Sequence, residues 1–225
     1  DGVMTYELII ERINSELANI LGNLVNRTIA MSHKYFGGVI QQPNTADALD
    51  EELKAVALAA PGKVAEKMEQ LRVADAIDEI FVLLRRANKY IDETAPWALA
   101  KNEETKPRLG TVLYNLLESI RIAAVLLESF LPDTSRRILE QLNCENGGLE
   151  SLKVFGALES GKSVQTPEIL FARLDMEKKL AEIDAFNQAK AKEKLPALQI
   201  EPYAQENVDF DTFCKSDLRA VKVKD

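Results

Sequence analysis

Apolar residues recur with a helical period along most of the chain and divide it into amphipathic segments. The first segment covers residues 5–36, with apolar positions three or four residues apart, which predicts one long helix. The second covers residues 48–72 and follows Thr45 and Asp47, two residues that can cap a helix start. Pro61 and Gly62 predict an interruption within it.

Two further stripes are more regular. Residues 73–91 form one helix that is apolar on one side, and residues 109–131 form the cleanest stripe of the chain, ending before Pro132. A shorter helix over residues 134–142 follows. Four or five helices joined by short turns predict an all-α fold, an antiparallel helical bundle.

The last third of the chain is less regular. Residues 143–166 contain four glycines and predict a loop with a brief strand at residues 152–155, and residues 167–192 turn helical again. Residues 191–203 are rich in Lys, Glu and Pro and are typical of an extended linker, and alternation over residues 218–223 is typical of a strand. We therefore expect a helical domain at 1–187 and a second segment, with the linker, at 188–225.

Composition and net charge limit the kinds of function that this chain can have. With 225 residues, 46% of them hydrophobic, the chain can bury a full core. The net charge of −8 argues against coating a duplex through its phosphates, but it permits the reading of unstacked bases in a single-stranded loop. Local basic runs occur at Arg85, Arg86 and Lys89 and again at Lys101, Lys106 and Arg108, and each can equally be a solvated helix face.

The expected compartment is the cytoplasm. Cys144 and Cys214 lie far apart and form no CxxC pair, which favours free thiols in a reducing environment. No segment resembles a signal peptide, and we expect no stretch of the roughly 20 apolar residues that a membrane span requires.

One segment matches a phosphate-binding motif. Residues 156–163 read GALESGKS, which fits the pattern G-x-x-x-x-G-K-S and would assign Lys162 and Ser163 to nucleotide hydrolysis. That mechanism requires a helix starting at the Lys and Ser, whereas Pro167 disfavours helix just beyond them. We therefore reject this hypothesis. The single histidine, His33, is expected to be a cation at a helix end, and we predict neither catalytic nor metal-binding residues.

A stronger set of candidate residues is polar and aromatic. Asn23 and Arg27 are four residues apart and therefore share one helix face, where an amide and a guanidinium can hydrogen-bond base edges. The only tryptophan, Trp97, follows Pro96 at the junction of two helical patterns, so its ring can be aimed outward as a stacking platform. Surface exposure for the polar pair and core packing for the ring are the simpler alternatives.

Four runs of the sequence favour a functional role for these residues over the simpler alternatives. They are ELANILGNLVNRT, ANKYIDETAPWALAK, FLPDTSRRI and PEILFARLD. In this order they resemble the helical C-terminal half of methionyl-tRNA synthetase, a class I enzyme, from residue 1 to about residue 183. The resemblance implies that Asn23, Arg27 and Trp97 contact the CAU anticodon of methionine tRNA and that Pro96 shapes the corner. Residues 208–225 are similar to the opening of an oligonucleotide-binding-fold appendage.

The family's HIGH and KMSKS motifs are missing from the sequence. We therefore expect a C-terminal fragment or separate polypeptide that selects tRNA and does not itself activate methionine. The resemblance implies a catalytic domain as partner, ATP with magnesium and in some members zinc in that parent enzyme, and a possible homodimer through the appendage. A helical scaffold or oligomerisation module without an RNA role is the main alternative.

Overall fold

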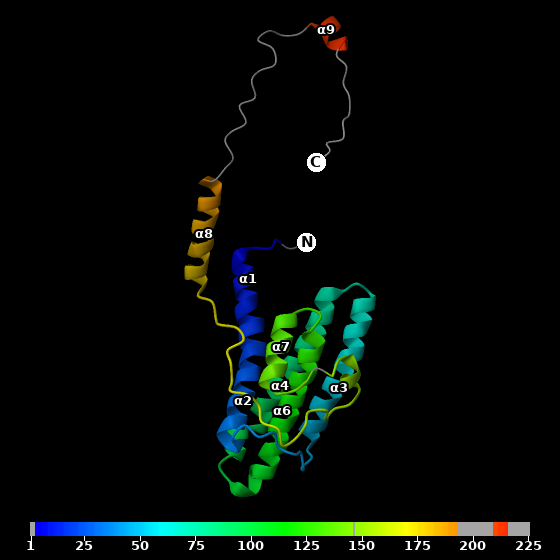
Figure 1. Ribbon diagram of the computed structural model, residues 1–225, viewed down its shortest axis with the longest axis vertical. Coiled ribbons are helices and arrows are strands. Elements are labelled where there is room, and N and C mark those ends of the chain that lie inside the picture. The colour runs from blue at the N-terminus through cyan, green and yellow to red at the C-terminus, as the bar shows by residue number, and fades with distance from the viewer. Residues whose placement is uncertain (1–2, 146, 193–208, 216–225) are drawn as a thin grey trace. The chain divides into compact units, whose positions relative to one another are not determined.

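The computed structural model describes residues 3–145, 147–192 and 209–215, and these residues are helical apart from loops and one isolated bridge between Val39 and Ser163 (Figure 1). The chain divides into two units, residues 1–180 and 181–225. Most of the predicted linker and the predicted strand-like alternation over residues 218–223 lie outside the described residues. Within the described residues 209–215, Phe210–Cys214 form a short helix, α9.

The first predicted helix is confirmed as a continuous run of three elements. These are α1 (Tyr6–Arg12), a π-helix η1 (Ile13–Gly22) and α2 (Asn23–Phe36). Thr5 caps the start by accepting a hydrogen bond from the Leu8 amide at 3.2 Å. The run ends at Gly37, whose φ of 62° is the left-handed conformation that glycine adopts at least cost. The π-helical middle was not predicted.

Four helices complete the bundle, and all four stripes are confirmed as helices: α3 (Ala48–Glu69), α4 (Val73–Thr94), α6 (Lys106–Leu127) and α7 (Pro132–Gln141). Short elements link them, namely α5 (Pro96–Leu99) and the 3-10 turns η2 (Glu103–Thr105) and η3 (Leu149–Lys153). In Figure 1 successive long helices alternate in direction and pack side by side. The predicted interruption at Pro61 is wrong, because α3 continues through it and gives up only the hydrogen bond that this residue cannot donate.

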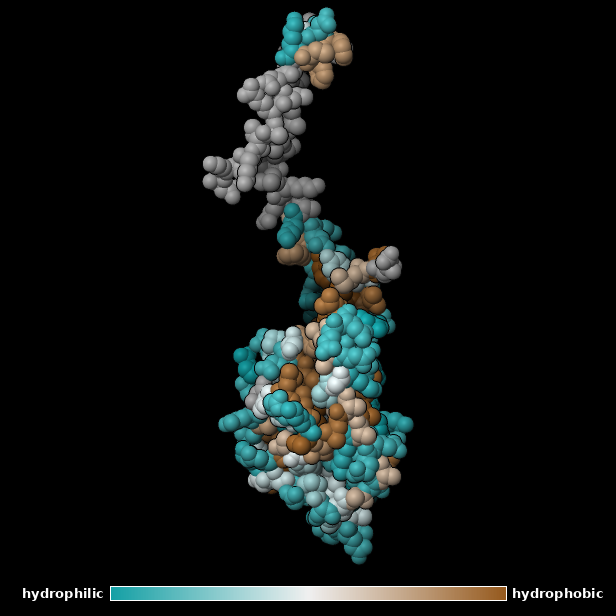
Figure 2. All heavy atoms as spheres, turned by 90° about the vertical axis from the view of Figure 1, so that its right-hand side faces the viewer, coloured by the Kyte–Doolittle hydropathy of each residue, from teal (hydrophilic) through white to brown (hydrophobic). Residues whose placement is uncertain are grey.

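Helix α6 is the core of the bundle. All of its residues from Leu109 to Leu127 are buried, so it packs against neighbours on every side. The segment Glu103–Leu127 is long and apolar enough to cross a membrane, against our expectation, but all of the apolar window lies inside the bundle. A buried core helix explains this composition. Figure 2, viewed from the α3 side, shows a hollow lined by apolar side chains, and a recess of about 660 Å³ lies between α3 and η3.

Two predictions for the last third of the domain are wrong. Residues 152–155 form no strand, because η3 and a bend occupy this place. Residues 167–175 are not helical, and α8 (Met176–Lys192) begins nine residues later than expected. Side chains satisfy the backbone of this stretch instead: Arg137 donates to the carbonyls of Ile169 and Leu170, and Asn14 pairs with both polar atoms of the Leu174 backbone.

Candidate nucleic-acid interface

Asn23 and Arg27 lie on the first turns of α2. Asn23 is exposed and Arg27 is half-buried, whereas Leu24 and Thr28 beside them are buried in the bundle. Among the described residues Arg27 has no ion-pair partner. The outer face of this helix therefore presents an amide and a free guanidinium, two groups that hydrogen-bond base edges or phosphates.

Trp97 stands on a corner with a constrained backbone. Ala95 ends α4 with φ 42° and ψ 64°, a left-handed conformation that is uncommon for a residue with a Cβ. Pro96 then starts α5 at a position where its missing amide hydrogen costs nothing. Pro96 is buried, while the Trp97 side chain is 46% exposed. The ring is thus presented outward by a fixed corner, and it is not part of the core.

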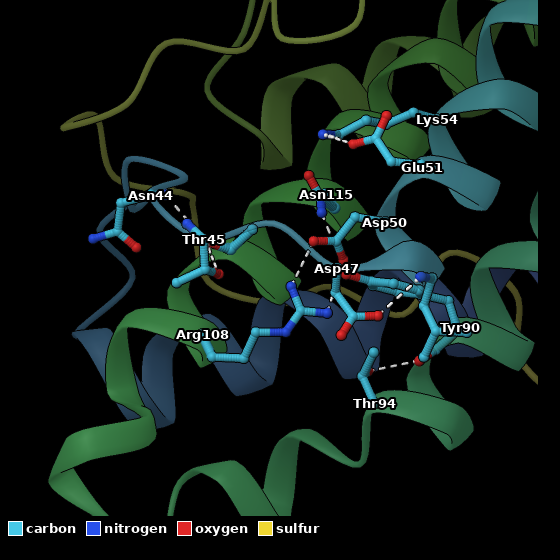
Figure 3. A network of polar contacts seen from close by, with 12 residues as sticks. Asn44, Thr45, Asp47, Asp50, Glu51, Lys54, Tyr90, Thr94, Arg108 and Asn115 are labelled. Carbon is cyan, nitrogen blue, oxygen red and sulfur yellow. Dashed lines mark hydrogen bonds and ion pairs between the residues drawn. The ribbon is translucent and has the colours of Figure 1, made fainter.

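A buried polar network holds this corner to the bundle (Figure 3). Asp50, at the start of α3, is fully buried and accepts two hydrogen bonds from the Arg108 guanidinium at 2.6 and 2.8 Å. It also accepts one from the Tyr90 hydroxyl. Thr94 donates back to the Tyr90 carbonyl at 2.6 Å, one residue before the left-handed Ala95. The end of α4 is thereby fixed to the starts of α3 and α6.

The network shifts the pKa values of Asp50 and Tyr90, among others. Burial alone would raise the pKa of Asp50, but the hydrogen bonds from Arg108 and Tyr90 hold the pKa of that carboxyl below its usual range. Burial, reinforced by the hydrogen bond to Asp50, raises the pKa of Tyr90 well above its ordinary value. Asp50 is therefore a buried carboxylate and Tyr90 a neutral donor at neutral pH.

The helix register brings the polar pair and the corner to the same end of the bundle. Asn88 on α4 donates to the carbonyl of Ile20 at 3.1 Å, and a groove near α1 joins Leu17 to Ile77 and Phe81 earlier on α4. The two helices thus run parallel. Asn23 and Arg27 follow Ile20 by three and seven residues, which is about 5 and 10 Å further along the helix axis. The same steps from Asn88 along α4 place Asn23 level with residue 91 and Arg27 level with residue 95.

Most of the predicted basic runs are neutralised. Arg86 pairs with Glu52 and Glu93. Lys89 also pairs with Glu93, and Lys106 pairs with Glu103. Within the described residues, the cations of these runs that have no ion pair are Arg85 and Lys101. Any attraction for a polyanion at this end therefore rests on a few single charges, not on a broad basic surface.

The phosphate-loop motif is occupied by the protein itself. The backbone amides of Gly156, Ala157 and Leu158 donate to the Glu118 carboxylate at 2.9 to 3.1 Å. Lys162 pairs with Glu159 at 2.8 Å, and no helix follows Ser163 before α8. A buried carboxylate takes the place that a phosphate would need, which agrees with the rejection of the hydrolase hypothesis.

Other reactive side chains are dispersed. The described residues contain no group of three or more His, Cys, Asp or Glu side chains placed to hold a metal ion. His33 lies in the last turn of α2 as predicted, with its Nε2 atom 2.9 Å from the carbonyl of Gln165. Cys144 and Cys214 are both free thiols.

Comparison with known proteins agrees with this architecture. The sequence pattern of the anticodon binding domain of methionyl tRNA ligase matches residues 41–191. The methionine–tRNA ligase of Clostridium perfringens is 48% identical over 223 residues, covering 99% of this chain and 34% of that protein. The corresponding ligase of Halalkalibacterium halodurans is 39% identical over 229 residues, with 100% and 34% covered. The chain thus spans about a third of the length of these relatives.

Solved structures give the same result. The apo form of the Mycobacterium tuberculosis methionyl-tRNA synthetase aligns with a TM-score of 0.73 at 32% identity, covering 78% of this chain and 36% of that one. Its form bound by methionyl-adenylate aligns with a TM-score of 0.70 at 31% identity, covering 76% and 34%. These matches place the chain in the class of helical anticodon-binding domains of aminoacyl-tRNA synthetases. It belongs to the family of the anticodon binding domain of methionyl tRNA ligase.

The sequence indicated the exposed candidate residues but not the buried residues that hold the Trp97 corner in place. Asp50, Tyr90 and Arg108 form the network beneath the corner, and none was assigned this role. One signal was available: Tyr90 interrupts the apolar stripe of α4 directly before Ile91, and a buried tyrosine hydroxyl requires a partner. The partner itself lies 40 residues away in sequence and could not be identified without the fold.

Proposed function

We propose that this domain recognises the CAU anticodon of methionine tRNA, with Trp97 stacking on a base and Asn23 and Arg27 reading base edges. The exposure of Trp97 on a fixed corner is the observation that carries the proposal, because a scaffold helix would place its only indole in the core. Stacking on such a platform contributes about 1 to 3 kcal/mol per base. Pro96 and the network below it set the position of the ring.

The proposal extends to the partners of the domain. The catalytic domain of the same synthetase would carry out methionine activation with ATP and magnesium, and with zinc in some members. Support comes from the relatives, which are about three times longer than this chain. An apolar groove of about 430 Å³ along α1, where Leu8 and Ile9 are partly exposed, offers a surface on which that domain can pack.

The compartment, the domain boundary and the C-terminal appendage are also part of the proposal. We place the enzyme in the cytoplasm, where its tRNA is used and where the two free thiols fit. The helical domain ends near residue 187, and residues 188–225 lead into a tRNA-binding appendage through which a homodimer can form.

The lone tryptophan provides the test. The full chain is titrated with anticodon stem-loops carrying CAU or a scrambled triplet while Trp97 fluorescence is followed. We expect saturable quenching that is at least tenfold tighter for CAU, which corresponds to about 1.4 kcal/mol. A Trp97→Ala variant, followed by a label on the RNA, should lose most of this preference. Equal binding of both loops, unchanged by the substitution, would favour the scaffold alternative.

A further inference from the structure

Helix α5, which carries Trp97, is only four residues long and depends on contacts at its two ends. A single helical turn has almost no stability of its own, because it fixes several residues for very few hydrogen bonds. Pro96 is buried and Leu99 packs against the core, whereas Trp97 and Ala98 between them are exposed. The direction of the indole ring is therefore set by whatever fixes the two ends of α5.

A side chain fixes the C-terminal end of α5. The Leu99 carbonyl is the last of the helix, where carbonyls lose their amide partners within the helix, and the Thr105 hydroxyl lies 2.6 Å from it. The same hydroxyl lies 2.9 Å from the Asn102 carbonyl. Because a hydroxyl has one proton, it donates to one carbonyl at a time, and the shorter distance favours Leu99. The Asn102 side chain also accepts from the Glu104 amide at 3.0 Å, so residues 99–105 form a closed turn.

The place of Thr105 in the chain makes its contact with Leu99 informative. Thr105 is the N-cap residue of α6, where a threonine normally accepts a hydrogen bond from an amide of the first turn. Within the described part of the chain, the Thr105 side chain makes no capping bond of this kind. It donates instead to a carbonyl six residues earlier. The hydroxyl thus stabilises the end of α5 and not the start of α6, while the left-handed Ala95 holds the other end of α5.

We infer that Thr105 is a positioning residue for Trp97, whose hydroxyl keeps the indole ring in the orientation in which a base can stack on it. The inference rests on the proposed function, which assigns Trp97 the role of a stacking platform. Thr105 acts through the backbone of α5 and needs no contact with the RNA. A ring that is already oriented loses less conformational freedom when a base binds, so a fixed α5 increases the affinity.

The only tryptophan of the chain allows this inference to be tested without RNA. Thr105→Val removes the hydroxyl and keeps the shape of the side chain, and time-resolved fluorescence anisotropy of the full chain measures how freely the Trp97 ring turns. We expect a larger fast component of the anisotropy decay in this variant. Thr105→Ser keeps the hydroxyl and should give the decay of the wild type.

RNA binding provides the second measurement. Affinity for the CAU stem-loop, followed by a label on the RNA, should fall roughly three- to tenfold in Thr105→Val, as expected for the loss of one hydrogen bond, and should recover in Thr105→Ser. Thr5→Val is the matched control, because it also removes one hydroxyl hydrogen bond, to the Leu8 amide at the start of α1. It should change neither the anisotropy decay nor RNA binding.

A second variant keeps the test independent of how well Thr105→Val folds, which far-UV circular dichroism checks. Asn102→Ala opens the same turn from its exposed side and should also free the Trp97 ring. An unchanged anisotropy decay in folded Thr105→Val, or in Asn102→Ala if Thr105→Val is unfolded, would overturn the positioning role. So would Thr105→Ser behaving like Thr105→Val, because the side-chain hydroxyl would then not be the group that matters.

The outcomes separate this inference from the proposed function. If the wild-type chain prefers CAU and Thr105→Val frees the ring without weakening the CAU loop, Thr105 does not position Trp97 for binding and the inference is wrong. If the wild-type chain binds the CAU and scrambled loops equally, anticodon recognition fails. A freer ring in Thr105→Val that is restored in Thr105→Ser would then still support the control of Trp97 orientation by Thr105.

Discussion

Removal of the Asp50 carboxylate should destabilise the domain more than any exposed ion-pair substitution. Asp50→Ala deletes three hydrogen bonds at a fully buried position and leaves the Arg108 guanidinium, whose side chain is only 19% exposed, without its partner. Breaking a buried pair by removing one partner costs about 3 to 5 kcal/mol. We expect about 3 kcal/mol, the lower end of that range, because Arg108 retains some access to water and Tyr90 keeps a hydrogen bond to Asn115.

Chemical and thermal unfolding followed by circular dichroism measure this cost. In a domain of this size about 3 kcal/mol corresponds to a fall in Tm of roughly 6 to 12 °C. Arg136→Gln is the matched control, since the side chains of Arg136 and its partner Asp133 are both exposed and their ion pair should contribute less than about 1 kcal/mol. If Asp50→Ala costs no more than this control, the network does not hold α3, α4 and α6 together and our account of the corner is wrong.

Three further predictions follow from the same contacts. The stability that the Asp50 carboxylate provides is present above about pH 5, and it is lost as the pH falls through the pKa of about 3.9 in the unfolded state and then through the lower pKa in the folded state. Asp50→Asn should therefore make the free energy of unfolding depend less on pH below about pH 5. An unchanged pH dependence would contradict the depressed pKa. Ala95→Gly relieves a left-handed backbone and should raise stability by up to about 1 kcal/mol in urea unfolding, whereas Ala95→Val should lower it; equal effects of both would remove the argument from strain. Glu118→Gln should speed hydrogen exchange at the amides of residues 156–158 by at least tenfold; retained protection would show that another group holds this loop.

The helical bundle could be predicted because the spacing of apolar residues indicates its long helices. The stripes of α4 and α6 follow directly from burial on one side or on all sides, and the Asp47 cap marked the start of α3. Failures occurred where tertiary contacts override local tendencies. Pro61 does not break α3, and the run after Pro167 stays extended because Asn14 and Arg137 bind its backbone.

The candidate site was predictable only in part. The exposed groups Asn23, Arg27 and Trp97 could be selected from their chemistry, spacing and the family resemblance. Their support could not be selected, because Asp50, Tyr90 and Arg108 converge from three helices that are distant in sequence. The π-helical turns before Asn23 were not predicted either, because the apolar spacing predicts a helix but does not show whether an amide bonds four or five residues back.

The most direct test of the central claim is the binding of the full chain to four anticodon stem-loops: one with CAU and three in which each base of the triplet is changed in turn. The account predicts that at least one change weakens binding by about 1 to 3 kcal/mol, as expected for loss of a good base contact. It also predicts that Trp97→Ala and Asn23→Ala reduce this discrimination. Four equal dissociation constants for the wild-type chain would contradict anticodon recognition by this surface.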